Sequence, residues 1–365
     1  MALPLAGLTV IAIEQAVAAP FATSRLADAG ARVIKIERPE GDFARGYDDV
    51  ALGQSSYFVW LNRGKETVVA DLTRPADKAM LAELLAGADV LVQNLKPGAL
   101  ARLGFGADRL ASDYPRLISC AISGYGETGP MADRKAYDLL IQAESGLCSI
   151  TGGPDQAARV GISIVDIATG ATAHAAILEA LIQRGITGRG ADISISMFDV
   201  MADWLTVPLL NHEGGKTPRR VGLAHPSIAP YGVFSCKDGA QVLIAIQNDR
   251  EWQGFATHFL EAPDMATDPR FASNVARVAN RSETDALVAT AFLRRDLGQA
   301  TGAILRAGVA FASVNDMAGL SQHPHLRRVT VETPNGPVSI PEPAAIFAGQ
   351  PRTYGPVPAL QGKTA

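Results

Sequence analysis

The chain has few of the residues that mark disulfide-bonded and metal-binding proteins. Its 365 residues include only three cysteines, which are scattered and show no CxxC spacing. Such a set argues against both a disulfide framework and a zinc site. The two histidines of "QHPH" at 322–325 have no cysteine or acidic cluster nearby and make a poor metal site. We therefore predict no metal.

Strong net charge is also missing. The formal net charge is -4, so the chain has no overall basic field, and we predict neither nucleic acid nor an anionic membrane as a partner. Hydrophobic residues make up 47% and charged residues 19%, and no low-complexity segment indicates disorder. The composition is that of a globular protein, in which an anionic ligand would need a local set of cations.

Long apolar runs and targeting signals are not apparent either. No apolar run reaches the roughly 18 residues of a membrane-spanning helix. The first residues, "MALPLAGLTVIAIEQ", lack a basic n-region and a small-residue cleavage site. From this pattern we expect a cytoplasmic protein.

The first half of the chain alternates β-branched runs with alanine-rich helical stretches. The expected strands are residues 8–14, 32–38, 67–72, 89–95 and 117–126. Strands and helices that alternate in this way indicate parallel βαβ units and an open sheet covered on both faces. We therefore predict an α/β fold.

The pattern changes after about residue 190. Two β-like runs joined by Lys-Asp-Gly predict a hairpin, and a mostly helical segment follows. The Gly/Pro/charge stretch "NHEGGKTPRR" resembles a linker, so we predict a large domain at residues 1–214 and a smaller α+β domain at 215–325. The proline-rich tail after residue 330 is expected to be irregular.

The usual ligand of such a sheet is a dinucleotide, but neither GxGxxG nor GxxxxGK[ST] occurs in the chain. The expected strand ends carry positive charge instead. These cations are Arg38, Arg63, Lys65, Lys96, Arg102, Arg134 and Lys135. Because ligands of open parallel sheets bind beyond the carboxyl ends of the strands, the cations predict a rim that binds a small polyanion. Each of them taken singly is also compatible with an ordinary solvated surface charge.

One carboxylate, Asp166, separates an apolar β-branched run from a helix-like run in "GISIVDIATGATAHAAILEAL". It could cap the helix by accepting hydrogen bonds from free backbone N–H groups. It could also be a nucleophile from which apolar neighbours exclude water. Desolvation of a charged carboxylate is unfavourable, and a helix N-terminus would offset part of that free-energy cost. The two roles are compatible in one residue.

Six segments are distinctive in combination: "LADAGARVIKIERPEGD", "LNRGKETVVADL", "ADVLVQNLKPGALARLGFG", "SGYGETGP", "KAYDLLIQAESGL" and "HPSIAPYGVF". Together they resemble the family III CoA-transferases, which include formyl-CoA transferase, carnitine CoA-transferases and the α-methylacyl-CoA racemases. The resemblance implies a Rossmann-like large domain completed by residues 326–365. It also implies ring-shaped chains interlinked as a homodimer.

The resemblance implies a site as well. Asp166 falls at the place of the family's catalytic aspartate. The positions implied to bind coenzyme A are Arg38, Lys65, Asn94, Arg102 and Lys135. The implied reaction moves CoA from an acyl-CoA to an organic acid through an aspartyl anhydride and an aspartyl-CoA thioester. Acyl-CoA is then a substrate, and no permanently bound cofactor is expected.

The segment after the linker bears on the acid that accepts CoA. "RRVGLAHPSIAPYGVF" resembles members that act on small dicarboxylic acids, so we expect a short organic acid, with dicarboxylates favoured. Arg219 or Arg220 could pair with a second carboxylate, or both could merely flank a linker. Only one glycine, Gly222, precedes His225 in residues 221–232, which leaves open whether this loop shields intermediates.

Two other functions stay open. A related racemase would use a histidine base where this chain has Tyr137, a poor proton acceptor at neutral pH. A non-catalytic CoA-binding protein is the third possibility. Tyr137 is equally compatible with a packed ring, Asp138 with a cap of the helix that follows it, and His225 with a residue that shapes its loop.

Overall fold

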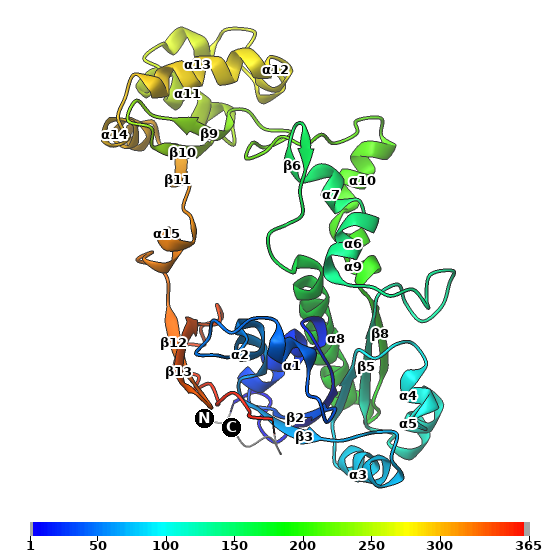
Figure 1. Ribbon diagram of the computed structural model, residues 1–365. Coiled ribbons are helices and arrows are strands. Elements are labelled where there is room, and N and C mark those ends of the chain that lie inside the picture. The colour runs from blue at the N-terminus through cyan, green and yellow to red at the C-terminus, as the bar shows by residue number, and fades with distance from the viewer. Residues whose placement is uncertain (1–2, 361–365) are drawn as a thin grey trace. The chain divides into compact units, whose positions relative to one another are not determined.

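The computed structural model describes residues 3–360 and shows two compact units (Figure 1). The first unit comprises the chain up to Leu147, residues Arg159–Leu210 and the chain from Arg327 onward. The second comprises Cys148–Ala158 and Asn211–Leu326. The division into a large domain at 1–214, completed by 326–365, and a small domain at 215–325 stays a prediction.

The first unit is built on a six-stranded sheet in which every neighbouring pair is parallel. Its strands are β1 (Thr9–Ile13), β2 (Arg32–Glu37), β3 (Lys65–Val69), β4 (Val90–Gln93), β5 (Ile118–Ser123) and β8 (Asp192–Ser196). They lie in the order β3-β2-β1-β4-β5-β8. The α/β fold with a parallel sheet is thus confirmed, and the order reverses between β1 and β4.

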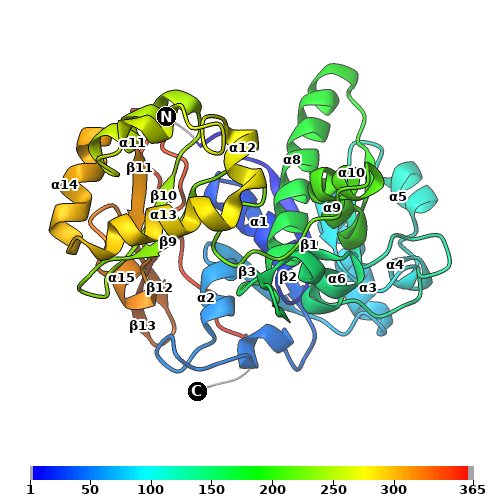
Figure 2. The same ribbon diagram turned by 90° about the horizontal axis from the view of Figure 1, so that it is seen from above.

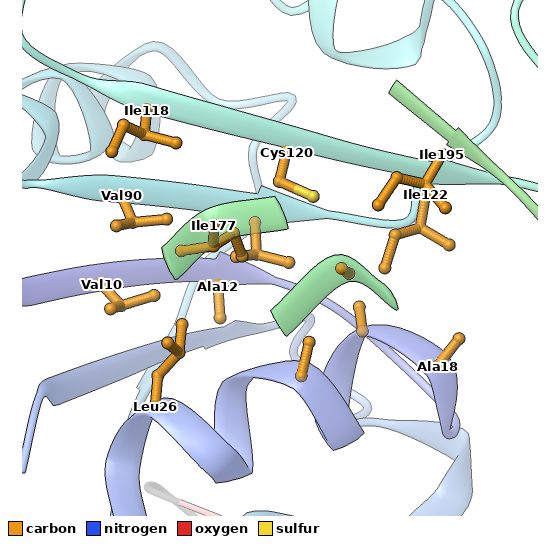
Figure 3. Packing of buried hydrophobic residues seen from close by; sticks show 14 of the residues in the cluster. Val10, Ala12, Ala18, Leu26, Val90, Ile118, Cys120, Ile122, Ile177 and Ile195 are labelled. Carbon is orange, nitrogen blue, oxygen red and sulfur yellow. The ribbon is translucent and has the colours of Figure 1, made fainter. Parts of the chain in front are cut away.

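Helices cover both faces of this sheet because alternate side chains of a strand point to opposite faces. Val10 and Ala12 of β1 belong to the core that includes α1 (Ala18–Asp28) and α8 (Ile164–Thr187), as Figure 3 shows. The intervening Ile11 and Ile13 pack with α3 and α5 on the other face. The bounds of these two helices are Pro75–Ala86 for α3 and Ala107–Asp113 for α5.

Helices α1 and α8 approach each other closely at a glycine, and Figures 1 and 2 both show them side by side. A Cβ atom on Gly170 of α8 would lie only 2.5 Å from the backbone oxygen of Ala18, the first residue of α1. Only glycine allows this approach without a shift of the backbone. The contact brings the start of α1 close to the first turns of α8.

Helix α8 has 24 residues and is apolar enough, by length and composition alone, to cross a membrane. Its residues Val165, Ala173 and Ile177 are fully buried in the core shared with α1 and the sheet. One face of α8 therefore packs in the core of the first unit, and 39% of its apolar stretch is buried there.

The proline-rich tail is more regular than we expected. Strands β12 (Arg328–Thr333) and β13 (Gly336–Pro341) form an antiparallel hairpin in the first unit, so the expectation of an irregular tail is wrong as far as Pro341. Residues 342–360 form no helix or strand, as expected. Pro337 and Pro341 are four residues apart, so their nitrogens face the same edge. In a ribbon of two strands one edge needs no ladder hydrogen bonds, and prolines are tolerated there.

Shorter elements complete the first unit and its boundaries with the second. They are η1 (Phe43–Gly46), α2 (Ser56–Asn62), α4 (Ala99–Arg102), α6 (Asp138–Glu144), α7 (Leu147–Ile150), α9 (Met197–Trp204) and α10 (Thr206–Glu213).

The second unit contains a three-stranded antiparallel sheet, in the order β11-β10-β9, with helices around it (Figure 1). The predicted Lys-Asp-Gly hairpin is confirmed as β9 (Tyr231–Ser235) and β10 (Gln241–Ala245). The other elements are β6 (Gly152–Gly153), β7 (Gln156–Ala157), α11 (Asp249–His258), η2 (Pro263–Ala266), α12 (Asn274–Ala279), α13 (Arg281–Leu293), α14 (Leu297–Ala307), β11 (Ala310–Ser313) and α15 (Met317–Ser321).

Candidate active site

A cavity of about 730 Å³ lies at the carboxyl ends of β1, β4 and β5 in the first unit. It is lined by the turn Gln15–Ala18 after β1, by Asn94–Pro97 after β4 and by Ser123 at the end of β5. The strand order reverses between β1 and β4, which is where open parallel sheets bind their ligands. Asp166 lines the same cavity.

Asp166 is the third residue of α8, which begins at Ile164 after Ser163. Within residues 3–360, its carboxylate makes no hydrogen bond and no ion pair. Burial raises the pKa of Asp166 to about 7, and the nearby charge of Asp138 adds to the rise. The site therefore holds a partly buried carboxyl group that titrates near neutral pH and is free to react.

Asp138, rather than Asp166, caps the start of α8. Its Oδ1 accepts hydrogen bonds from the backbone N–H groups of Val165 at 2.8 Å and of Asp166 at 3.3 Å. The interpretation of Asp166 as the helix cap is therefore wrong, because a carboxylate from α6 already occupies that position. Asp138 does not cap its own helix through its side chain, since it is the first residue of α6.

The same carboxylate explains the YDxxxQ spacing. Residues four apart on a helix face each other, and Oδ2 of Asp138 accepts a hydrogen bond from Nε2 of Gln142 at 2.7 Å. The buried Gln142 in turn accepts the backbone N–H of Val160 at 2.9 Å. The Asp138–Gln142 pair therefore fixes both the start of α8 and the segment that leads into it.

Aromatic side chains form part of the cavity wall: Phe43, Tyr47, Tyr57 and Tyr137. The rings of Tyr47 and Tyr57 meet edge to face with centroids 5.5 Å apart. Burial raises the pKa of Tyr47 to about 12, with smaller contributions from carboxylates that include Asp166. No motif spacing marks the first three of these residues in the sequence, so none of them was predicted.

Unpaired cations surround the cavity. Lys96, Arg102 and Lys135 line it, and an adjoining cavity of about 260 Å³ is lined by Arg38 together with Lys96 and Arg102. All four side chains are exposed, and none has an ion-pair partner among residues 3–360. Three of the predicted CoA-binding residues, Arg38, Arg102 and Lys135, are thus brought to neighbouring cavities.

Lys135 reaches this position because its chain segment packs closely against the end of β5. A Cβ atom on Gly124 would lie 2.2 Å from the Cβ of Ala136, so a side chain there would displace the segment. Glycine at this position lets Lys135 and Tyr137 line the cavity.

Asn94 also lines the cavity, but its amide group is engaged. Its Oδ1 accepts the backbone N–H of Gln15 at 3.0 Å, and its Nδ2 donates to the Gln15 carbonyl at 2.8 Å. Asn94 thus holds the turn after β1 in place, and this is the contact that the structure shows for it.

Lys65 is not on the rim. It begins β3 instead of following it, and its buried Nζ lies 2.6 Å from Oε1 of Glu14 and 3.2 Å from the Pro20 carbonyl. Burial lowers the pKa of Lys65 to about 8, while Glu14 opposes that change. The expected place of Lys65 on the rim is wrong, because a buried ammonium needs a charged partner and this one has it. Arg63 is likewise buried and paired, with Asp28.

The network around Lys65 extends to the cavity. Glu14 also pairs with Lys35, whose Nζ lies 2.8 Å from Oδ2 of Asp42. The other oxygen of Asp42 accepts the backbone N–H of Ala16, a cavity residue with a φ of 63°. This buried network therefore supports the strained turn beside the cavity.

Three residues singled out near the linker belong to the second unit. The Arg220 guanidinium donates to the carbonyl groups of Ser149, Gly153 and Pro154 at 3.0 to 3.2 Å, so it is bound to backbone and is not available to pair with a carboxylate. His225 stacks on Tyr231 and accepts a hydrogen bond from its own loop. Arg219 is exposed.

The cysteines form no disulfide in the described part of the chain. Cys120 and Cys236 are buried, Cys148 is partly buried, and all three are free. Among residues 3–360 no three His, Cys, Asp or Glu side chains lie close enough to hold a metal ion.

Known proteins of one family match most of this chain. The family model "CoA-transferase family III" matches residues 5–364. The chain is 39% identical to an acetyl-CoA:oxalate CoA-transferase of Acetobacter aceti, over 93% of this chain and 87% of that protein. It is 36% identical to a succinate–glutarate CoA-transferase of Agrobacterium fabrum, over 92% and 87%.

A solved structure agrees as well. A CAIB/BAIF family protein from Brucella suis superposes with a TM-score of 0.82 at 34% identity, and the match covers 97% of this chain and 95% of that one. The chain is therefore an enzyme of CoA-transferase family III.

Proposed function

We propose that this CoA-transferase moves CoA from an acyl-CoA thioester to a short dicarboxylic acid, with Asp166 as the nucleophile. The observation that carries the proposal is the unpaired carboxylate of Asp166 in a cavity at the sheet's reversal point, with unpaired cations around it. A hydrated carboxylate is a weak nucleophile, and partial burial removes water from this one.

The proposed reaction has four steps. The Asp166 carboxylate attacks the thioester carbonyl, which gives a mixed anhydride and CoA thiolate. The thiolate attacks the aspartyl carbonyl and releases the donor acid, which leaves an aspartyl-CoA thioester. The acceptor carboxylate then attacks that thioester to form a second anhydride and free thiolate. The thiolate finally attacks the acceptor's acyl carbonyl, which forms the new acyl-CoA and restores Asp166.

The developing negative charge on each carbonyl oxygen needs hydrogen-bond donors. Val17 and Ala18 line the cavity at the start of α1, and their backbone N–H groups donate to no acceptor among residues 3–360. The close packing at Gly170 brings this helix end near the start of α8. Free N–H groups at a helix N-terminus stabilise negative charge.

The unpaired cations suit the phosphate groups of CoA. Arg38, Lys96 and Arg102 line the smaller cavity, which shares Lys96 and Arg102 with the cavity that holds Asp166. Phosphates bound there would leave the thioester end of CoA directed toward Asp166. The scheme needs no group besides the two substrates.

The acid class rests on the names of the relatives, which act on oxalate and glutarate. Both are dicarboxylates. We further propose a cytoplasmic enzyme that works as an interlinked homodimer. A sedimentation run that found an active monomer would overturn the dimer.

The test incubates the full-length chain with acetyl-CoA and succinyl-CoA and a panel of free mono- and dicarboxylic acids. Transfer predicts a new thioester for at least one acid, and a CoA adduct on the peptide that contains Asp166 in mass spectrometry. Epimerisation of a chiral acyl-CoA without a new thioester would indicate a racemase. Binding of acyl-CoA with neither reaction would indicate a non-catalytic protein.

A further inference from the structure

One cation of the Asp166 cavity is not explained by CoA binding. Arg159 lines this cavity together with Ser163 and Asp166 and is absent from the lining of the smaller cavity that Arg38 shares. Its side chain is exposed, and its guanidinium makes no hydrogen bond or ion pair among residues 3–360. An unpaired guanidinium in the same cavity as the nucleophile is free to bind an anion.

The backbone at Arg159 is held in place. The N–H of the next residue, Val160, donates to the buried Gln142 at 2.9 Å, and Gln142 is bound to Asp138, which caps α8 at Val165. The backbone at Arg159 is thereby held by the same Asp138–Gln142 pair that fixes the start of α8. A cation whose base is fixed loses less conformational freedom when it binds a ligand.

Another arginine of this cavity, Arg134, already has partners within the protein. Its guanidinium lies 3.3 Å from the Glu144 carboxylate and over the ring of Tyr125. Arg220, which we expected to meet a second carboxylate, is bound to backbone carbonyls in the second unit. Among residues 3–360, Arg102 and Arg159 are thus the arginines of this cavity without a partner, and Arg102 also lines the smaller cavity that suits the CoA phosphates, which leaves Arg159 for a second anion.

We propose that Arg159 binds the distal carboxylate of a dicarboxylic acid and so determines which acids accept CoA; this inference rests on the function proposed above. One carboxylate of the acid must reach the reacting carbonyl at Asp166, and the other then needs a cation in the same cavity. A guanidinium can hold a carboxylate through two parallel hydrogen bonds, which selects a second carboxylate over a methyl group.

The experiment compares glutarate with butyrate, which is the same chain with a hydrogen atom in place of the second carboxylate. Wild type, Arg159→Gln and Arg159→Lys are titrated with each acid by calorimetry, and each variant is also titrated with acetyl-CoA. In Arg159→Gln we expect the Kd of glutarate to rise about 10- to 100-fold, since a hydrogen bond to a charged group is lost. The Kd values of butyrate and acetyl-CoA should not change. For Arg159→Lys the Kd of glutarate should lie between those of wild type and Arg159→Gln, because lysine keeps the positive charge but cannot form the two parallel hydrogen bonds of a guanidinium.

Turnover gives a second readout. In Arg159→Gln, kcat/KM should fall for glutarate as acceptor and stay unchanged for butyrate. The matched control is Arg134→Gln, which removes a paired arginine from the same cavity and should keep the preference for glutarate over butyrate.

The outcomes separate the two proposals. Unchanged glutarate binding in Arg159→Gln, equal losses for both acids, weaker acetyl-CoA binding, or no glutarate binding by wild type would each overturn the role of Arg159. Arg159-dependent glutarate binding in a chain that forms no thioester would support this role and refute the proposed transfer.

Discussion

The carboxylate of Asp138 accepts a hydrogen bond from the backbone N–H of Val165 at 2.8 Å, across 27 residues of the chain. This contact joins α6 to the start of α8. It also places a negative charge near Asp166, whose pKa burial and that charge raise to about 7. One residue therefore caps the helix of the proposed nucleophile and tunes its protonation.

The first prediction concerns pH. If ionised Asp166 attacks the thioester, kcat/KM should rise about tenfold per pH unit below the pKa and level off above about 7. Asp138→Asn removes the neighbouring charge and keeps an oxygen that can accept the Val165 N–H, so the midpoint should move to lower pH. It should stay above the ordinary value of 3.8, because burial is the larger cause. A midpoint that does not move when Asp138 is replaced would contradict the coupling.

The second prediction separates reactivity from stability at Asp166. A carboxyl group whose pKa is raised on folding binds more protons in the folded state, so it lowers stability as pH rises from about 4 to 7. Asp166→Asn removes this penalty. Its Tm relative to wild type should therefore be higher at pH 8 than at pH 5, while transfer is lost.

Thermal melts at both pH values test this expectation, with deamidation excluded by mass spectrometry. A variant that is less stable at pH 8 than at pH 5, relative to wild type, would show that the carboxylate has a stabilising partner.

The third prediction uses two glycines of α8. A Cβ at position 170 would lie 2.5 Å from the Ala18 carbonyl oxygen, so Gly170→Ala must push α1 away from α8. We expect a loss of about 1–3 kcal/mol in the free energy of unfolding, as for overpacking, and a fall in kcat. Gly185→Ala is the matched control, because a Cβ there meets nothing within 4 Å. That variant should gain up to about 1 kcal/mol from helix propensity and keep its activity. Urea unfolding and steady-state kinetics measure both, and equal effects of the two changes would refute the packing argument.

The fourth prediction contrasts two cations. Lys65→Ala leaves Glu14 buried with one of its two ammonium partners removed, and breaking a buried pair costs about 3–5 kcal/mol of stability. Arg38→Ala removes an exposed, unpaired side chain and should leave stability unchanged but weaken CoA binding. Urea unfolding and CoA calorimetry on both variants test the contrast. A Lys65→Ala protein that keeps its stability but binds CoA more weakly would contradict this prediction and indicate that Lys65 binds CoA.

Much of this protein was determined by local sequence. The β-branched runs and alanine-rich stretches of the first half predict a parallel α/β sheet, because strand and helix periodicity depend on neighbours a few residues apart. The Lys-Asp-Gly turn predicts the hairpin of β9 and β10 for the same reason. The family's motif positions likewise pointed to Asp166, Arg102 and Lys135, which line one cavity.

Tertiary structure decided which polar groups are free. Lys65 and Lys135 look alike in the sequence, yet Glu14, distant in the chain, pairs with Lys65 while Lys135 stays unpaired. Asp138 and Asp166 both stand in the sequence where a helix cap is expected, and the packing of α6 on α8 gives that role to Asp138. The availability of a charge depends on partners far away in sequence, and local patterns carry no information about them.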